Sequence, residues 1–429
     1  MDNKKMSQNV RSNDHLNNSS EDEYLEKMKG IVCGTAMPIG FDTWSTKEQH
    51  DWLDQNIRKY FPNVPETLQN IIPGAFSLID YNRPQEKLPE WVDMDKYRRG
   101  QKFVREHYFS IVVTLFFGAI YSYTFNDVSK PIIIGGNSHT LFLALKRYLS
   151  TVKRVFTWFN GEPWVKDTEA YRNMQFTRKK HLMIGTKVSQ MDNEQYYAAS
   201  KIANSWCPEY ELLRKDFATT CPFEEPRQRP YKMFDGTSYK LKSINDMTMA
   251  ITQANFVLLP VLYPQNIGIH GVTDEDLEAY CHMWKCYGYF LGIKDEYNLC
   301  HGNLEDIKRC LRDLTQYWTK VNFKDIEPEF VYITKCIIIS LRHYYSSLYL
   351  PYKTAVLLFT EILNLNMPNL YASLSYTEWI AYKMYRFLLH HALKFSSVRS
   401  IINRLTYKIF EAVLYLDSKK MAKLHEKTK

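Results

Sequence analysis

One histidine in a helical stretch has the surroundings expected of a buried ligand. In segment 168–191, His181 shares one helix face with apolar and small residues: Met174, Thr177, Ile184 and Val188. Lys179 and Lys180 project from other faces. A neutral imidazole on an apolar face needs a partner, because a buried polar group without one costs free energy. His181 is therefore either a hydrogen-bonded core histidine or a ligand of a metal or haem iron.

Arg147 and Thr151 form a second polar pair on an otherwise apolar helix face. They lie four residues apart and share that face with Thr140, Ala144 and Val155. An arginine beside an apolar stripe commonly extends its head group to water. The alternative is that the Arg147 guanidinium pairs with a buried anion, such as a propionate.

Other sequence motifs point to no further chemistry. The chain lacks the phosphate-binding GxxxxGK[ST], the zinc-protease HExxH, the hydrolase GxSxG and a dinucleotide-binding GxGxxG. Gly135-Gly136-Asn137-Ser138 precedes a helix and is either a plain turn or a weak anion cradle. The eight cysteines contain no CxxC spacing, which favours buried free thiols in a reducing compartment over a zinc site.

The composition predicts a globular, mainly helical protein. Of the 429 residues, 45% are hydrophobic and 24% charged, which excludes disordered, collagen-like and small disulfide-rich proteins. Glycine (16 residues) and proline (17 residues) together make up about 8% of the chain. The average for globular proteins is about 12%. So few turn-forming residues favour long helices, and no alternating strand pattern is present. We therefore predict an all-α fold.

The periodicity gives a set of expected helices. A capping box at Ser45–Glu48 opens one helix to about Phe61. Further helices are expected at 93–125, from Asn137 or Ser138 to Phe159, at 168–191, at 193–213 with a break at Cys207-Pro208, at 243–261, and at 273–292. Three or four more fill 303–416. The regions follow: a disordered tail at 1–28, an N-terminal helix and Pro-rich connector at 29–92, a core at 93–302 and a C-terminal helical region at 303–429.

The run from Tyr108 to Phe125 is free of charge over 18 residues, the lower limit for a membrane span. A helix that is apolar all round is also typical of the core of a large protein. Both readings stay open from sequence. The N-terminal residues are polar and include no apolar signal segment, so we expect an intracellular protein.

The positive charge is concentrated at the C-terminal end. Residues 376–429 hold eleven Lys or Arg and four Asp or Glu, which accounts for +7 of the net +8. Ile401, Leu405 and Ile409 make an apolar stripe with Arg404 and Lys408 beside it. A basic amphipathic helix is typical of membrane-surface contact, here on the cytoplasmic face of a membrane such as the endoplasmic reticulum, or of the solvated face of a core helix. No nucleic-acid-binding motif accompanies the patch.

Several short motifs together resemble the rubber oxygenase (latex-clearing protein) family, which includes fungal oxygenases bound to the endoplasmic reticulum. The strongest are Arg147-Tyr148-Leu149-Ser150-Thr151 and, 34 residues after the arginine, Arg178-Lys179-Lys180-His181. Other matching stretches are Trp91-Val92-Asp93, Arg99-Gly100-Gln101, Met249–Gln253 with Phe256, and Trp284 with Gly288 and Leu291-Gly292-Ile293. The resemblance covers about residues 90–300.

The resemblance implies a globin-like helical core that holds haem b, with extra C-terminal helices. By it, His181 is the axial ligand of the iron, and Arg147, Thr151 and Arg178 lie at the cofactor. The family reaction is cleavage of a carbon–carbon double bond by O₂ in a lipophilic isoprenoid chain. Absence of a CxxCH motif fits a haem that is not covalently attached.

Two departures from the family pattern bear on the reaction. Rubber-cleaving members carry a lysine where this chain has Ser150, and a carboxylate base upstream of the arginine where this chain reads Lys130-Pro131-Ile132. A general base contributes roughly 10²–10⁴ in rate. We therefore expect a haem oxygenase acting on another lipophilic, unsaturated substrate. The alternatives are a haem- or lipid-binding membrane-associated protein without turnover, and a polytopic membrane protein.

Overall fold

The described part of the chain is mainly helical, and the all-α prediction is confirmed. The computed structural model describes residues 38, 40–230, 232, 244–344 and 350–428. Within these ranges no β-strand occurs, and a single antiparallel bridge joins Leu78 to Asn245. The expected tail at 1–28 and Cys33 lie outside the described residues.

The N-terminal helices follow the local signals closely. Helix α2 (Thr46–Tyr60) begins at the predicted capping box, in which Ser45 and Glu48 exchange hydrogen bonds. Helix α3 (Glu66–Gln69) and a 3₁₀ turn (Ile72–Phe76) follow in the Pro-rich connector. Residues 77–92 then run without a helix to the next element.

The expected continuous helix at 93–125 is wrong: the chain forms two helices that meet at His107. Helix α4 (Met94–Glu106) and helix α5 (Tyr108–Ser122) are bent by 94°. Asn403 stabilises the bend, because its amide donates to the Glu106 carbonyl at 2.6 Å and accepts from the Phe109 N–H at 3.0 Å. The bent pair has the length and composition of a broken span, and no single described helix is long and apolar enough to cross a membrane.

The next three helices carry the candidate residues. Helix α6 (Asn126–Ile134) leads through a short connection to α7 (Leu141–Phe159), which is capped by Thr140 and not by Asn137 or Ser138 as expected. Helix α8 (Glu169–Ser189) begins at Thr168 and is close to its predicted bounds. Helices α7 and α8 are neighbours, and α8 also contacts α6 and α12.

The expected 193–213 helix is two separate elements, α9 (Asn193–Ala199) and α10 (Glu209–Thr220). Helix α11 (Asp246–Leu262) and helix α12 (Asp274–Leu291) agree with expectation, and α12 has the predicted capping box at Thr273. Helix α11 is buried along nearly its whole length and packs beside α5, while α12 packs beside α4. These four helices form the centre of the fold.

The C-terminal region holds more and shorter helices than the three or four expected. They are α13 (Leu304–Asp313), a π-helical turn (Leu314–Thr319), α14 (Lys320–Asn322), α15 (Pro328–Tyr344), α16 (Tyr352–Ile362), α17 (Pro368–Ala372), α18 (Tyr376–His390), α19 (Ser396–Glu411) and α20 (Ser418–Lys427). Helix α15 packs on α7, and α19 packs on α5, α7 and α4. The main hydrophobic cluster runs from Phe41 to Phe410 and so crosses all three predicted regions after the tail.

Candidate functional site

His181 lies on the middle of α8 as a neutral ligand-competent imidazole. Its Nδ1 is buried and has no hydrogen-bond partner among the described residues. Burial, and then the positive charge of Arg154, lower the pKa of His181 from 6.5 to about 4. The imidazole is therefore uncharged at pH 7, which is the form that binds metal ions. Buried polar atoms usually have a hydrogen-bond partner, so this nitrogen is open to a ligand, and His107 at the α4–α5 bend has a similar orphan Nδ1.

Arg147 is held inside the fold without a counter-ion. Its Nη1 donates to the Ser138 hydroxyl and its Nη2 to the Tyr123 hydroxyl, both at 2.6 Å. The guanidinium also lies over the Tyr148 ring, 5.1 Å from its centroid. No acidic residue in the described ranges forms an ion pair with Arg147. Burial acts to lower the pKa of Arg147, but the neighbouring Tyr123 and Tyr148 hydroxyls outweigh it and raise the pKa above its ordinary value.

Thr151 and Ser150 complete this stretch of α7 with local contacts. The Thr151 hydroxyl donates to the Arg147 carbonyl one turn earlier, at 3.1 Å, and the residue is exposed. The Ser150 hydroxyl accepts from Arg154 at 2.7 Å. Because the Thr151 bond is to its own helix, the structure by itself gives this side chain no cross-helix role.

The pairing of α7 with α8 brings His181 to the level of Arg147 and Thr151. Asn173 donates to the Thr157 hydroxyl at 3.1 Å, and Arg154 lies 4.6 Å from the Phe176 ring centroid. Arg154 lies three residues before Thr157 on α7, whereas Phe176 lies three residues after Asn173 on α8. The two helices are therefore antiparallel. Continuing that register places His181 opposite Leu149, between Arg147 and Thr151 on the chain.

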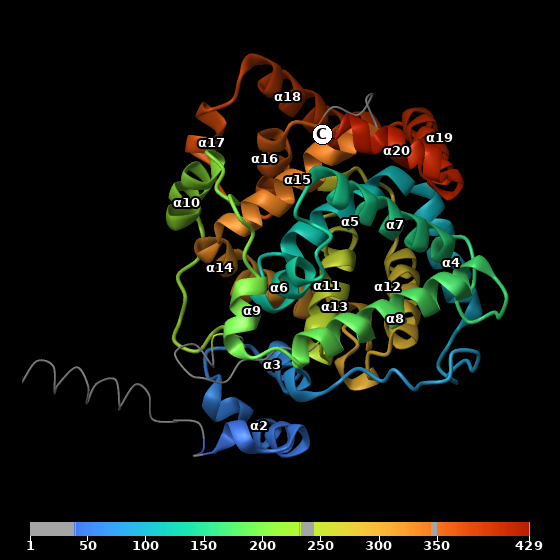
Figure 1. The fold of residues 1–429 in the computed structure, drawn as a ribbon. Helices are drawn as coiled ribbons and strands as arrows, with labels where there is room; N and C mark the ends of the chain where they lie inside the picture. Colours follow the sequence, from blue (N-terminus) through green and yellow to red (C-terminus); the bar gives the residue numbers. More distant parts are fainter. Residues whose placement is uncertain (1–37, 39, 231, 233–243, 345–349, 429) are drawn as a thin grey trace, which may run out of the picture.

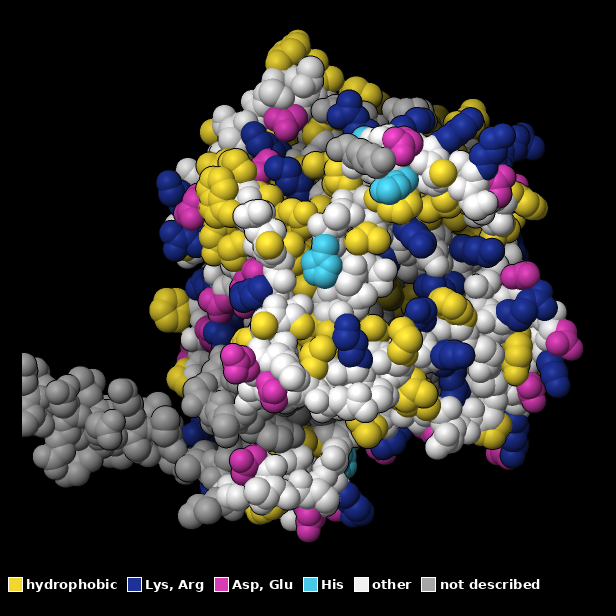
Figure 2. Space-filling view, in the orientation of Figure 1, with side chains coloured by type: hydrophobic (Ala, Val, Ile, Leu, Met, Phe, Trp, Pro, Cys, Tyr) yellow, Lys and Arg dark blue, Asp and Glu magenta, His cyan; other side chains and the backbone are white. Residues whose placement is uncertain are grey.

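Four neighbouring helices each leave one stripe only half-buried. The stripes contain apolar and small polar residues: Val112, Leu115, Phe116 and Ala119 on α5, Tyr148, Val152 and Val155 on α7, Thr177, His181 and Ile184 on α8, and Thr252 and Phe256 on α11. Such stripes on helices that otherwise lie inside the fold indicate a space that neighbouring side chains do not fill. Figure 2 shows a recess in the surface between α7 and α8.

Arg178, the other predicted cofactor residue, is engaged by main-chain carbonyls. It is buried, and its guanidinium donates to the carbonyl oxygens of Arg83, Phe290 and Asp80, each at 3.3 Å, and to that of Tyr81. These contacts fix the connector against the C-terminal end of α12, where a cation is favourable. These contacts explain the burial of Arg178 without any bound ligand. Its role at a cofactor stays a prediction.

The remaining motif residues hold the central helices together. Gly100 allows α4 to approach α12, since a Cβ there would lie 2.5 Å from the Ala279 carbonyl oxygen. Gln253 donates to the Trp284 carbonyl at 2.9 Å, which ties α11 to α12. Phe256 stacks on Trp284 with ring centroids 5.5 Å apart. The motifs on α7 and α8 therefore border the recess, and those on α4, α11 and α12 build its support.

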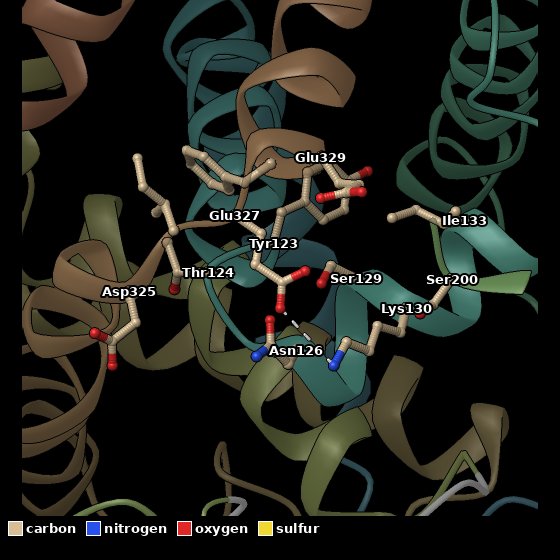
Figure 3. A pocket seen from close by; sticks show the side chains of 12 residues that line it. Tyr123, Thr124, Asn126, Ser129, Lys130, Ile133, Ser200, Asp325, Glu327 and Glu329 are labelled. Carbon is tan, nitrogen blue, oxygen red and sulfur yellow. Dashed lines mark ion pairs between the residues drawn. The ribbon is translucent and has the colours of Figure 1, made fainter. Parts of the chain in front are cut away.

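A separate polar pocket lies between α6 and the start of α15 (Figure 3). Lys130 and Glu327 face each other across it, with Nζ 4.0 Å from Oε1. Lys201 lies 2.7 Å from Glu327 and 3.6 Å from the buried Glu329. Tyr123 lines the same pocket. The acid that pairs with Lys130 on α6 thus comes from a segment almost two hundred residues later.

Sequence reasoning missed the three side chains that surround the Arg147 guanidinium: Tyr123, Ser138 and Tyr148. Tyr148 was within the recognised motif, but nothing local indicated that the other two would converge on Arg147. The expected buried thiols are confirmed for the seven described cysteines. No group of three or more His, Cys, Asp or Glu within the described ranges could hold a metal ion.

The arrangement suits a flat, largely apolar ligand with a metal centre and an anionic edge. The imidazole offers one nitrogen to a metal, the guanidinium offers hydrogen bonds to a carboxylate, and the half-buried stripes offer apolar walls.

Comparison with known proteins gives one structural relative and nothing from sequence. No protein-family model and no curated protein matches the chain. The structure is similar to the solved structure of latex clearing protein in its closed state. The match has 14% sequence identity and a TM-score of 0.48, and it covers 90% of this chain and 94% of that one.

Proposed function

We propose that this chain binds haem b in the recess between α7 and α8, with His181 as the iron ligand, and acts with O₂ on a lipophilic unsaturated substrate. The observation that carries the proposal is the presence, on adjacent helices, of a half-buried neutral imidazole and of a half-buried guanidinium that has no carboxylate partner in the described ranges. The sequence motifs on the same two helices supply the second support.

The residues of the site fit haem b. The unpartnered nitrogen of His181 identifies a histidine that its own fold leaves free to bind iron. Arg147 can receive a propionate, because Ser138 and Tyr123 orient its guanidinium while leaving donors unused. When bound, the haem supplies the iron at which O₂ is activated.

The walls of the recess favour an oily substrate. Phe116 on α5 and Phe256 on α11 present half-buried rings, and Val152 and Val155 line α7. Apolar walls of this kind exclude water and bind hydrocarbon by the hydrophobic effect. We therefore assign the substrate to the class of unsaturated lipids, with isoprenoid chains as the first candidates.

The positions of two acidic residues, Glu327 and Glu329, decide whether rubber cleavage is assigned to this chain. At the stretch where rubber-cleaving relatives carry a base, Lys130 is paired with Glu327 instead. Glu329, which is buried nearby, lines the polar pocket, and it forms no hydrogen bond or ion pair with Arg147 or Tyr123. We therefore do not assign rubber cleavage to this chain.

A second candidate function is haem or lipid binding without turnover. The favouring observation is that the guanidinium of Arg147 bonds to hydroxyl groups and forms no ion pair with a carboxylate in the described ranges. Both candidates predict a haem protein, and only the first predicts O₂ consumption.

Two measurements on the purified full-length protein test the proposal. Hemin titration should give a saturable absorbance change, and the loaded, reduced protein should consume O₂ when unsaturated isoprenoid lipids are added. Saturable hemin binding with no O₂ consumption on any unsaturated lipid would favour the binding protein. No hemin binding would contradict both candidates.

A further inference from the structure

Exposed apolar side chains gather in one C-terminal part of the molecule. Nine of the eighteen large apolar residues that are exposed in the described ranges lie within 371–415. Single exposed apolar residues are ordinary on any protein, whereas a cluster marks an interaction surface. The cluster is unexplained by the haem site.

Two helices, α18 and α19, contribute to this cluster, and the exposed apolar residues on each helix share one side of it. On α18, Tyr376, Met384 and Phe387 occupy one arc and are 75%, 65% and 62% exposed. On α19, Ile401 and Leu405 share the outward side, one turn apart. Phe395, which lies between the two helices, is also exposed. We call these six residues the α18–α19 face.

One side of α19 is bound to the core, so the opposite side faces solvent. Asn403 binds the junction of α4 and α5 through two hydrogen bonds, and Thr406 and Phe410 are buried beside it. Of the apolar stripe recognised from sequence, Ile401 and Leu405 therefore point away from the core, whereas Ile409 is half-buried against it.

Unpaired cations surround the α18–α19 face. Lys394, Arg404 and Lys408 are exposed, and none of them forms an ion pair with an acid in the described part of the chain. Lys419, Lys423 and Lys427 on α20 are likewise exposed and without such a pair. In Figure 1, α18, α20 and α19 lie along the end of the molecule opposite α2, and Figure 2 shows Lys and Arg interspersed with hydrophobic side chains at that end.

We propose that the α18–α19 face docks the protein on an anionic lipid bilayer. Exposed Phe, Tyr, Leu and Ile side chains would enter the headgroup region, while the unpaired Lys and Arg contact lipid phosphates and carboxylates. A second copy of the chain is the less favourable occupant, because a symmetric contact would bring the same unpaired cations together. A lipid surface instead supplies the missing negative charge.

Docking in this way would bring the bilayer near the helices of the recess. Helix α19 packs directly on α5 and α7, and the ring of His425 on α20 lies 4.2 Å from that of Phe142 on α7. The docking proposal itself does not require haem or turnover.

Co-sedimentation of the full-length protein with vesicles tests the proposal. We expect binding to phosphatidylcholine–phosphatidylserine vesicles, little to pure phosphatidylcholine vesicles, and loss of binding at high salt. Arg404→Gln with Lys408→Gln should weaken binding about 25-fold, roughly fivefold for each charge. The matched pair Lys59→Gln with Lys87→Gln, outside the face, should bind as the unmodified protein does.

Apolar contact is tested separately. Phe387→Ser with Leu405→Ser should weaken vesicle binding by at least about tenfold, while Phe223→Ser with Leu88→Ser, exposed elsewhere, should not. Absence of sedimentation with anionic vesicles would overturn the proposal. So would a vesicle-free dimer in sedimentation equilibrium that Phe387→Ser with Leu405→Ser abolishes. Hemin titration of the same proteins tests haem binding separately from vesicle binding, since either proposal can fail while the other holds.

Discussion

The Nη2 of Arg147 donates a hydrogen bond to the hydroxyl of Tyr123 at 2.6 Å, across the space between α7 and the end of α5. A phenol is a neutral partner, so the bond orients the guanidinium without neutralising its charge. Arginine is commonly buried with a carboxylate, because an unpaired internal charge is costly. This pair therefore holds a cation ready for an anion that the described protein does not supply.

Tyr123→Phe should weaken hemin binding as well as stability. Removing the acceptor leaves Arg147 with the Ser138 hydroxyl alone, which should cost about 1.5–3 kcal/mol in unfolding free energy. The matched control is Tyr121→Phe, which loses a buried bond of 2.8 Å to the Phe359 carbonyl. Urea unfolding should show a loss of stability in both, and hemin titration a loss of affinity only in Tyr123→Phe. Equal hemin affinities would remove Tyr123 from the site.

Arg154→Met should raise the pKa of His181. Burial is the main cause of the low pKa of about 4, and the positive charge of Arg154 adds to it. Without that charge, the pKa should move upward but stay below 6.5, since the burial remains. NMR titration of the His181 ring in the haem-free protein measures this directly. A pKa that does not move would show that Arg154 and His181 are further apart than the structure has them.

The haem-free protein should lose stability as pH falls from 6.5 toward 4. His181 and His107 both have a pKa lowered to about 4 by burial, whereas in the unfolded chain they bind protons near 6.5. The unfolded state therefore takes up protons first, at a cost of up to about 3 kcal/mol per histidine. Urea midpoints should fall over this window, and less steeply for His107→Gln or His181→Gln. An unchanged slope in both variants would contradict the buried neutral state.

Gly118→Ala should destabilise the wall of the recess. A Cβ at Gly118 would lie 2.4 Å from the Asn255 carbonyl oxygen, where α5 crosses α11. Forcing the helices apart should cost about 1–3 kcal/mol. Gly185→Ala on α8 is the matched control, because the nearest atom to its Cβ would be 3.7 Å away. Thermal unfolding should separate the two, and equal melting temperatures would contradict the close crossing.

Elements fixed by local signals could be predicted from the sequence. Helix α8 begins at Thr168, whose hydroxyl accepts from the Tyr171 N–H, and its apolar periodicity is unbroken to Val188. Likewise, the capping boxes at Ser45 and Thr273 mark the starts of α2 and α12, and each involves only residues next to one another in the chain. The position of His181 on the inward, half-buried face of this helix followed from the same periodicity.

Features that depend on distant residues could not be predicted in this way. The bend at His107 has no proline or glycine to signal it, and Asn403 supplies the stabilising bonds from nearly three hundred residues away. Similarly, Tyr123 and Ser138 meet Arg147 only because α6 folds back between them. The amphipathic stripe of α19 was recognised, but which side faces the core is decided by Asn403.

The account rests centrally on His181 as the haem ligand, and a hemin titration followed by absorbance tests it most directly. The matched control is His107→Ala, which removes a second histidine with a pKa lowered to about 4 and a buried Nδ1 without a partner in the described ranges, located at the α4–α5 bend. The unmodified protein and His107→Ala should both develop a Soret band, and His181→Ala should not. A Soret band of equal intensity and affinity in His181→Ala, or none in the unmodified protein, would contradict the account.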